Sequence, residues 1–302
     1  MKTFASLVKR NSKLFFKDKG LFFVSLITPL ILLVLYITFL GNVYKDAFLQ
    51  GMAGNQNVPE SIINGLVGGQ LFSSLLAVCC VTVAFCSNML MVQDKISGAR
   101  QDFLIAPLNK TKLALSYYVS TFITTLIICL VAFISCLIYV AVVGWYLTFG
   151  SIMLILLDVF LLTMFGTVLS SIVNYFLTSQ GQISAVGSIV SSVYGFICGA
   201  YMPISNFGEG LKNVVSLLPG TYATSLLRNH TMGGAINKLQ SIGVIESEID
   251  KLKDIVDCNI YCFGQKVSEP AMYLILIGAI VVLVGIYITI TLKSNKKSKK
   301  QK

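Results

Sequence analysis

Residues Asp94–Leu108, with the sequence DKISGARQDFLIAPL, separate two long apolar regions of the chain. No charged residue occurs in Ser61–Gln93, and the single charged residue in Leu113–Gly208 is Asp158. A short polar stretch between regions this apolar must lie at a membrane face, and its cations place that face in the cytoplasm. These cations are Lys95, Arg100, Lys110 and Lys112. The stretch is either an ordinary solvated turn or a segment that binds a soluble partner.

The composition predicts an integral membrane protein. Of 302 residues, 55% are hydrophobic and 12% are charged, which excludes a soluble domain. The formal net charge is +10. Most of the Lys and Arg residues lie in residues 1–20, 93–112 and 293–302, as the positive-inside rule predicts for cytoplasmic segments. Membrane topology therefore explains the basic charge, and we expect no nucleic-acid partner.

Hydropathy predicts an all-α membrane protein, with one transmembrane domain of six spans. The predicted spans are residues 21–40, 65–92, 113–141, 149–173, 183–202 and 271–292. Residues 41–60 are expected to form a polar outer loop. The break at Gly144–Tyr146 is placed outside and the polar break at Asn174–Gln182 inside. Six spans place both termini in the cytoplasm of a multi-pass plasma-membrane protein, with the Lys-rich tail 293–302 against anionic lipid.

The pattern of residues 1–19 predicts an amphipathic helix on the inner leaflet. At helical spacing, its apolar face carries Phe4, Leu7, Val8 and Phe15. Its opposite face carries Lys2, Lys9, Arg10, Lys13 and Lys17. A basic helix with an apolar, aromatic-rich face binds at a membrane surface. The alternative is a basic tail that only sets topology.

Two pairs of glycines at four-residue spacing predict close helix packing. They are Gly65 and Gly69 in the second predicted span, and Gly195 and Gly199 in the fifth. Small residues at this spacing allow two helix backbones to approach each other. The pattern favours packing, within the chain or across a dimer, over a ligand-binding role.

Residues 203–269 form a large outer segment. Up to Arg228 it contains amphipathic pieces too short to span a membrane and too apolar for a free loop, which favours a re-entrant or interfacial hairpin. A small amphipathic helix around Ile249–Val256 is expected to cap the outer face. Cys258 and Cys262 are a candidate disulfide if this face is oxidising. We expect no metal site there, because no histidine lies nearby.

Asp158 is the only charged residue inside a predicted span. A carboxylate within a membrane is costly, and by default it indicates a function. It could relay a proton, contact a substrate or pair with a polar neighbour. The sequence therefore leaves open an ion-coupled carrier or channel that uses Asp158. The only histidine, His230, is expected to be structural.

The chain has no motif that would make it an enzyme. It contains no Gly-x4-Gly-Lys-Ser/Thr phosphate loop and no His-Glu-x-x-His motif, and a single histidine cannot supply a His/Cys metal cluster. We therefore expect no catalytic residue, metal or cofactor on this chain.

In three places the sequence resembles the membrane subunit of a type-2 ABC exporter, and the resemblance covers essentially the whole chain. The three places are the basic N-terminal helix with Phe16-Lys17-Asp18 and Pro29-Leu30, the stretch Asp94–Gly98 with Phe103–Leu108, and the stretch Pro219–Tyr222 with Leu227-Arg228. The second is similar to the family's acidic-x-x-x-Gly … Leu-x-x-Thr-Pro-Leu pattern. The sequence departs from the family in Ala106, where Thr is usual, and in the long insert 235–269.

The resemblance implies that Asp94–Leu108 is a coupling helix seated in a groove of a separate ABC-type ATPase subunit, which binds ATP and Mg. The implied coupling residues are Asp94, Gly98, Arg100, Phe103, Leu104 and Pro107. Two permease copies, identical or sister chains, would enclose a cargo path lined by the second and fifth spans. The implied outer gate contains Pro203, Pro219, Tyr222 and Arg228.

The same resemblance implies a mechanism and a class of cargo. ATP binding would draw the two coupling helices together, tilt the spans and move the cavity from inner to outer access. A path that is apolar apart from Asp158 fits an amphipathic or hydrophobic cargo, such as a drug, an antibiotic peptide or a lipid-like molecule. The alternatives are the ion-coupled carrier or channel and a membrane scaffold that binds a partner without transport.

Overall fold

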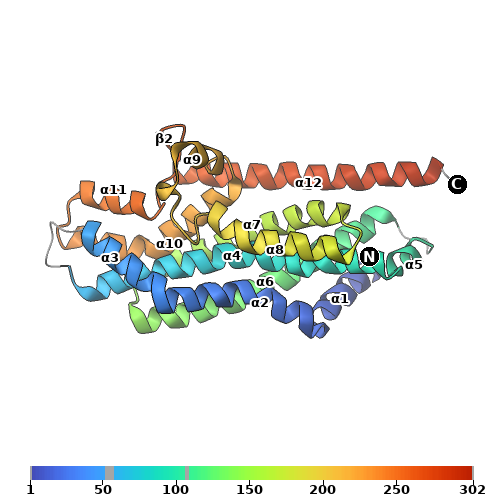
Figure 1. Ribbon diagram of the computed structural model, residues 1–302, viewed down its shortest axis with the longest axis horizontal. Helices are drawn as coiled ribbons and strands as arrows, with labels where there is room; N and C mark the ends of the chain where they lie inside the picture. Colours follow the sequence, from blue (N-terminus) through green and yellow to red (C-terminus); the bar gives the residue numbers. More distant parts are fainter. Residues whose placement is uncertain (1, 52–57, 106–108, 301–302) are drawn as a thin grey trace.

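The computed structural model of the protein describes residues 2–51, 58–105 and 109–300. In chain order its elements are α1 (Lys2–Lys17), α2 (Lys19–Leu35), the π-helical turn η1 (Tyr36–Leu40), α3 (Gly41–Gly51), α4 (Glu60–Ile96), α5 (Ala99–Ile105), α6 (Lys110–Val143), α7 (Phe149–Phe176), α8 (Gln180–Ile197), the 3-10 turn η2 (Ile204–Asn206), α9 (Glu209–Val215), α10 (Pro219–Ser241), α11 (Glu246–Ile255), β1 (Tyr261–Cys262), β2 (Gln265–Lys266) and α12 (Glu269–Lys300). The helices run along one long axis (Figure 1). We call the end that holds α1, α5 and the C-terminal part of α12 the basic end, and the end that holds α3 and α11 the far end.

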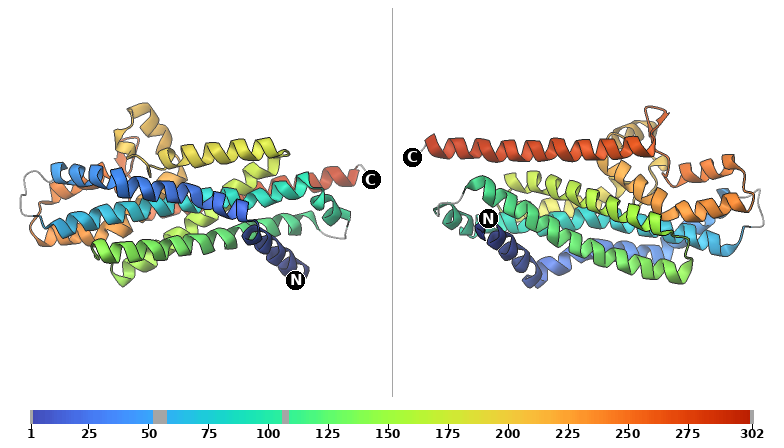
Figure 2. Two further views of the ribbon diagram at one scale, coloured as in Figure 1. Left: turned by 60° about the horizontal axis from the view of Figure 1, so that its bottom comes forward. Right: turned by 180° about the vertical axis from the view of Figure 1, so that it is seen from behind.

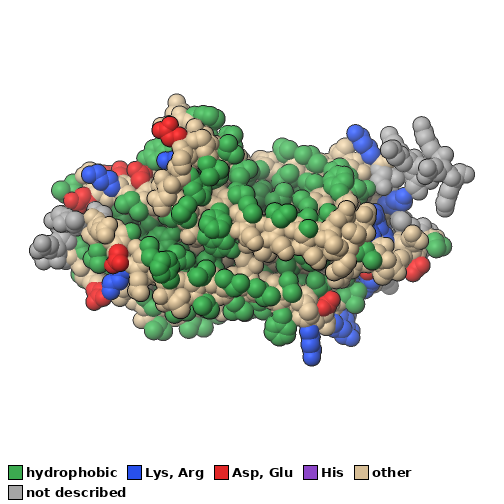
Figure 3. Space-filling view, viewed as in Figure 1, with side chains coloured by type: hydrophobic (Ala, Val, Ile, Leu, Met, Phe, Trp, Pro, Cys, Tyr) green, Lys and Arg blue, Asp and Glu red, His purple; other side chains and the backbone are tan. Residues whose placement is uncertain are grey.

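Within the described residues, five helical segments are long and apolar enough to cross a membrane. They are Lys19–Gln50, Glu60–Ile96, Lys110–Val143, Phe149–Phe176 and Glu269–Lys293. They contain five of the predicted spans, and the all-α fold class is confirmed. The span predicted at 183–202 corresponds to α8, an 18-residue helix that is rich in Ser, Gly and Gln, so a sixth crossing stays a prediction. Apolar side chains cover much of the middle of the molecule (Figure 3).

The 37-residue helix α4 is the centre of the bundle. Within its most apolar window, 94% of the residues are buried inside the molecule. It packs against α2, α6, α7, α8 and α10, and it runs through the bundle in both views of Figure 2. Burial by protein instead of lipid lets α4 carry polar side chains. For example, Asn88 Nδ2 donates hydrogen bonds to Ser170 Oγ at 3.1 Å and Ser171 Oγ at 3.0 Å.

Of the first glycine pair, Gly69 produces the predicted close packing of two helices, whereas Gly65 packs against Tyr146 in the link between α6 and α7. A Cβ atom at Gly69 would lie 2.7 Å from Met232 Cγ and 3.0 Å from the Thr231 carbonyl oxygen, so a larger residue would push α10 away from α4. Thr231 Oγ1 also donates to the Gly69 carbonyl at 2.9 Å. The second pair does not behave as predicted. Gly199 follows the end of α8 and has a φ of +76°, a left-handed conformation that favours glycine.

The segment predicted as an outer loop, residues 41–60, begins as a helix. The helical path continues from α2 through η1 into α3, up to Gly51. Composition misled the prediction, because Tyr44 and Phe48 lie one turn apart among polar residues and both are buried. Tyr36 stacks on Tyr44 with ring centroids 5.7 Å apart, and its hydroxyl donates to Ser74 Oγ at 3.1 Å. These contacts attach the continuous helix to α4.

Up to α10 the outer segment contains a short helix followed by a long one, where only short pieces were predicted. α9 has seven residues, whereas α10 runs on beyond Arg228 to Ser241 and is largely buried against α4, α7 and α12. The amphipathic helix expected around Ile249–Val256 is present as α11, with Ile249 and Leu252 buried. A two-residue antiparallel pairing of β1 with β2 then leads into α12.

Candidate functional site

A tight turn links the central helix to the short helix α5 at the basic end. α4 ends at Ile96, and Gly98 has a φ of +83°, which reverses the chain direction in a conformation that suits glycine. The Gly98 carbonyl then accepts from the Gln101 backbone N–H at 2.8 Å, within the first turn of α5. Gly98 therefore fixes where α5 begins. Pro107 lies outside the described residues, and so does the side chain of Leu104.

Asp94 binds α1 and α6 and is turned away from solvent. Arg10 donates to its two carboxylate oxygens at 2.6 and 3.0 Å, and the Tyr117 hydroxyl donates to Oδ2 at 2.5 Å. The hydrogen bonds to Asp94 raise the pKa of the Arg10 guanidinium. The sequence had placed Arg10 on the lysine face of α1. That placement is wrong, because Arg10 points into the bundle toward a residue far away in the chain.

Phe103 of α5 packs against the Arg10–Asp94 ion pair. The Arg10 guanidinium lies 4.9 Å from the centre of the Phe103 ring, and Phe103 packs against a buried cluster that contains Leu7, Met91 and Tyr117. Ile105, on the same helix, is 84% exposed. α5 therefore uses one aromatic side chain to hold the bundle and leaves an apolar side chain uncovered.

Lys95 ties the same turn to α7. Its Nζ donates to the backbone carbonyls of Asn174, Tyr175 and Leu177 at 3.0, 2.5 and 3.0 Å. A cation at this position stabilises the partial negative charge at a helix C-terminus. Arg100 of α5 lies 6.0 Å from the centre of the Tyr175 ring. The turn and α5 are thus connected to α1, α4, α6 and α7 together, and we call this assembly the coupling module.

A groove of about 950 Å³ separates α2 from α8. Its lining includes Val24, Ile27, Ile31, Leu35 and Phe39 from α2 and η1, Ser184, Ser188, Ser191 and Ser192 from α8, and Cys86 and Met89 from α4. One wall is apolar and the other carries hydroxyl groups one helical turn apart. The second predicted span, which is α4, contributes only Cys86 and Met89. The two walls come from the first predicted span, α2, and the fifth predicted span, α8.

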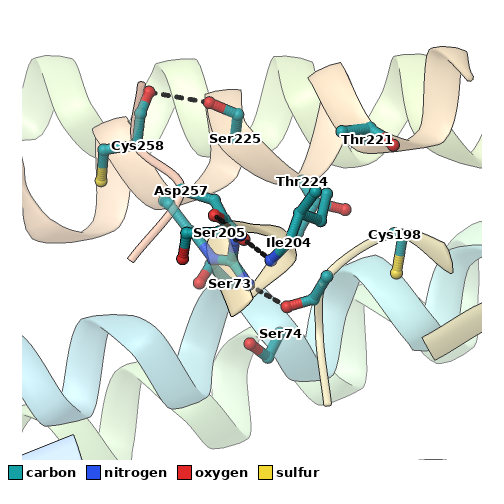
Figure 4. Close-up of polar contacts among 12 residues, drawn as sticks. Ser73, Ser74, Cys198, Ile204, Ser205, Thr221, Thr224, Ser225, Asp257 and Cys258 are labelled. Carbon is teal, nitrogen blue, oxygen red and sulfur yellow. Dashed lines mark hydrogen bonds and ion pairs between the residues drawn. The ribbon is translucent and has the colours of Figure 1, made fainter. Parts of the chain in front are cut away.

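A buried ion pair between Arg228 and Asp257 lies beside the turn that follows α8. Figure 4 shows Asp257 of this pair next to Ile204 and Ser205. Arg228 donates to Asp257 Oδ2 at 3.2 Å and to the Gly199 carbonyl oxygen, and both charged side chains are almost fully buried. Asp257 also accepts from the backbone N–H groups of Ile204, at 2.5 Å, and Ser205, at 3.1 Å. Burial lowers the pKa of Arg228, but Asp257 together with the nearby Tyr44, Tyr36 and Cys258 outweighs burial, and the net pKa is raised.

The structure does not bring the four predicted gate residues into one contact. Arg228 binds Asp257, a residue that the sequence did not single out, whereas Pro203 only precedes the turn η2, whose Ile204 backbone N–H binds the same carboxylate. Pro219 is the first residue of α10. Tyr222 packs in a different cluster, with Leu226, Ile260, Met272 and neighbours.

Asp158 has partners on two other helices. Its Oδ2 lies 2.6 Å from Nδ1 of His230 on α10, and its Oδ1 accepts from the Tyr273 hydroxyl of α12 at 2.6 Å. Of the three roles considered from the sequence, pairing with polar neighbours is the one that this geometry displays. His230 joins α10 to α7 through this contact, and its structural role stays a prediction.

Cys258 and Cys262 are both free thiols in the structure. Cys258 is buried, and its burial raises the pKa of the thiol to about 12. A thiol with this pKa is protonated at neutral pH and reacts slowly in disulfide exchange. The two thiols are not joined in this structure, and a disulfide on an oxidising face stays a prediction.

The comparison with known protein families agrees with this architecture. No curated protein sequence matches the chain significantly. The ABC-2 family transporter protein family matches residues 49–287, which run from the end of α3 into α12. The match includes α4, the turn before α5, the serine-bearing groove wall on α8 and the Arg228–Asp257 ion pair, whereas the apolar wall on α2 lies before it. A match over most of the chain, together with five helices that can cross a membrane, assigns the family. This protein is a multi-pass membrane permease of the ABC-2 transporter family.

Proposed function

We propose that the protein is the permease subunit of an ATP-driven ABC exporter, which moves an amphipathic or hydrophobic cargo outward by alternating access. The observation that supports this most is the coupling module. A short helix with an exposed apolar residue, Ile105, is attached to α1 and to three helices long enough to cross a membrane through Phe103, Lys95 and the Arg10–Asp94 pair. A force applied to α5 is therefore passed to α1, α4, α6 and α7 together.

In this proposal the basic end lies on the cytoplasmic side of a cell membrane. Lys and Arg residues of α1, of the turn around α5 and of the C-terminal tail support this orientation through the positive-inside rule. A separate ABC-type ATPase would bind α5 there and would hold ATP and Mg. When ATP binding draws two ATPase subunits together, the two attached coupling modules move with them and tilt their helices.

The groove between α2 and α8 supports a cargo path formed with a second permease copy, either identical or a sister chain. Its apolar wall on α2 and its hydroxyl-bearing wall on α8 offer both kinds of contact that an amphipathic molecule needs. Cargo would pass from this groove toward the far end. Arg228, Asp257 and the turn after Pro203 would close the outer exit, since they lock α10 to the end of α8.

A co-purification experiment tests the proposal. The tagged chain is extracted gently from native membranes, and ATP hydrolysis and co-purifying proteins are measured. We expect an ATPase subunit with the wild type and none with Ile105→Asp, because a charge at this exposed position prevents apolar docking without touching the buried core. Ile245→Asp is the matched control, since Ile245 is 63% exposed at the other end of the molecule. The proposal fails if no ATPase appears with the wild type in several mild detergents, or if both variants lose it equally.

An ion-coupled carrier based on Asp158 is the second candidate. The pairing of Asp158 with His230 inside the bundle is the observation that favours it. Against it, Asp158 is 1% exposed and both of its oxygens are already hydrogen-bonded, so an ion would have to displace His230 or Tyr273. A non-transporting scaffold would tolerate changes in α5 that abolish transport by an exporter.

A further inference from the structure

A small pocket lies at the basic end, beside the coupling module. It lies where α5, α6, α7 and α12 meet, and its lining includes Arg100, Lys110, Tyr117, Tyr175, Tyr287 and Thr291. We call it the inner pocket. Its cavity volume of about 20 Å³ is enough for one oxygen atom of the size of a water molecule. Tyr287 and Thr291 are buried there, so the pocket is set into the side of the bundle.

The charge around the inner pocket is positive and not neutralised by the described part of the chain. Arg100 and Lys110 are half-buried, and within the residues described neither forms an ion pair. The nearby carboxylate of Asp94, to which Tyr117 donates, is already held by two nitrogens of Arg10. α6 begins at Lys110, and the backbone N–H groups at the N-terminus of this helix add a partial positive charge. An anion in the pocket would offset the cost of two partly desolvated cations.

The surroundings favour a lipid as the source of this anion. Next to the lining residues Tyr287 and Thr291 on α12, Ile286 and Leu292 are exposed apolar side chains. A molecule with an anionic group and hydrocarbon chains would satisfy both surfaces at once. Tyrosine hydroxyls are also common at the depth of lipid head groups.

We propose that the inner pocket binds the phosphate of an anionic phospholipid from the cytoplasmic leaflet. One phosphate oxygen enters the cavity, Arg100 and Lys110 contact the phosphate, and the acyl chains lie along α12. The choice of leaflet rests on the proposed orientation of the basic end. Since Arg100 belongs to α5, a bound lipid would also join the coupling module to α12.

Lipid retention by the purified full-length chain tests this proposal without any transport assay. The chain is delipidated in neutral detergent and mixed with dioleoyl phosphatidylglycerol or dioleoyl phosphatidylcholine, and the bound lipids are counted by native mass spectrometry. We expect one phosphatidylglycerol molecule to be retained at least about fivefold better than phosphatidylcholine. Lys110→Gln should lower this retention about fivefold, and Lys110→Arg should restore it.

Lys112→Gln is the matched control, because Lys112 lies on the same helical turn of α6 but does not line the pocket. It should change retention less than twofold, with gel filtration confirming that all variants are folded. An equal loss in Lys110→Gln and Lys112→Gln would show only general surface attraction and would overturn the proposal. Complete displacement of the lipid by millimolar inorganic phosphate would show a site for free anions instead.

A protein ligand is the remaining outcome that would overturn the lipid site. In that case the wild type retains no phosphatidylglycerol, while Lys110→Gln abolishes co-purification of the ATPase. Failure of the lipid site leaves the Ile105→Asp experiment unaffected. The inner-pocket proposal and the exporter proposal can therefore fail separately.

Discussion

His230 Nδ1 and Asp158 Oδ2 lie 2.6 Å apart, although 72 positions separate the two residues in the chain. The contact joins α10 to α7, and Tyr273 adds α12 to the same carboxylate. A buried carboxylate with two partners on other helices holds α7, α10 and α12 together. A structural role of this kind needs no ion movement.

Asp158→Asn should weaken the fold and leave coupling intact. It removes a charge from two buried hydrogen bonds, so we expect the free energy of unfolding to fall by about 1.5–3 kcal/mol. Thermal unfolding in detergent measures this loss, and Tyr273→Phe, which removes one of the two bonds, should cost less. ATP hydrolysis by the co-purified complex in proteoliposomes should persist in Asp158→Asn and be indifferent to an imposed proton gradient. Loss of transport by a folded Asp158→Asn protein, with no ATPase bound, would instead support the ion-coupled carrier.

Asp94→Asn should release α1 from the bundle. The substitution breaks a two-nitrogen contact with Arg10, and hydrogen bonds to charged groups of this kind contribute about 1.5–3 kcal/mol. We expect α1 to become more sensitive to limited trypsin digestion at its lysines, together with a lower melting temperature. Lys13→Ala is the control, because Lys13 is exposed on the same helix and should change stability by less than about 0.5 kcal/mol. Unchanged digestion in Asp94→Asn would show that the ion pair does not hold α1.

Arg228→Met should be one of the most destabilising single substitutions in the chain. It leaves the Asp257 carboxylate buried without its cation, and breaking a buried pair in this way costs about 3–5 kcal/mol. The double variant Arg228→Met with Asp257→Asn should be more stable than Arg228→Met alone, because no unpaired charge is left. Thermal unfolding of the two single variants and the double variant forms the test. If adding Asp257→Asn lowers the stability further, the unpaired Asp257 carboxylate is not the cause of the loss in Arg228→Met.

Gly69→Ala should separate α4 from α10. Its new methyl group would meet Met232 Cγ at 2.7 Å and the Thr231 carbonyl at 3.0 Å, and overpacking of this kind costs about 1–3 kcal/mol. Gly233→Ala on α10 is the opposite case, because a Cβ atom there meets nothing within 4 Å. Gly233→Ala should be neutral or stabilising by up to about 1 kcal/mol, because alanine is the better helix former. Melting temperatures that fall equally in both variants would contradict the close approach.

The sequence predicted those parts of the structure that depend on neighbouring residues. Long apolar runs gave the membrane helices, and Gly144–Tyr146 and Asn174–Gln182 marked real breaks, the second with a Ser179–Gln182 capping box that starts α8. Residues 41–51 and the second half of α10 were missed because local polarity outweighs helical periodicity there. In both segments, burial against α4 determines the outcome.

The polar contacts between distant segments were the least predictable part. Nothing in the helical pattern of α1 separates Arg10 from the lysines beside it, and Asp257 looks like any acid of a soluble insert. Asp158 drew attention because it is charged within an apolar run, yet its partner His230 is ordinary in sequence. A one-dimensional pattern shows which residue needs a partner, whereas the fold decides which residue provides it.

The burial of α4 has a consequence for how the protein is made. α4 leaves the ribosome before α6, α7 and α10, which are among its packing partners. Until these helices follow, the side chains of Gln70 and Asn88 have no protein to surround them, and lipid is a poor substitute. The insertion machinery must therefore shelter α4 during synthesis. A chain that stalls or is truncated before α6 would expose these groups and become a target for membrane quality-control proteases.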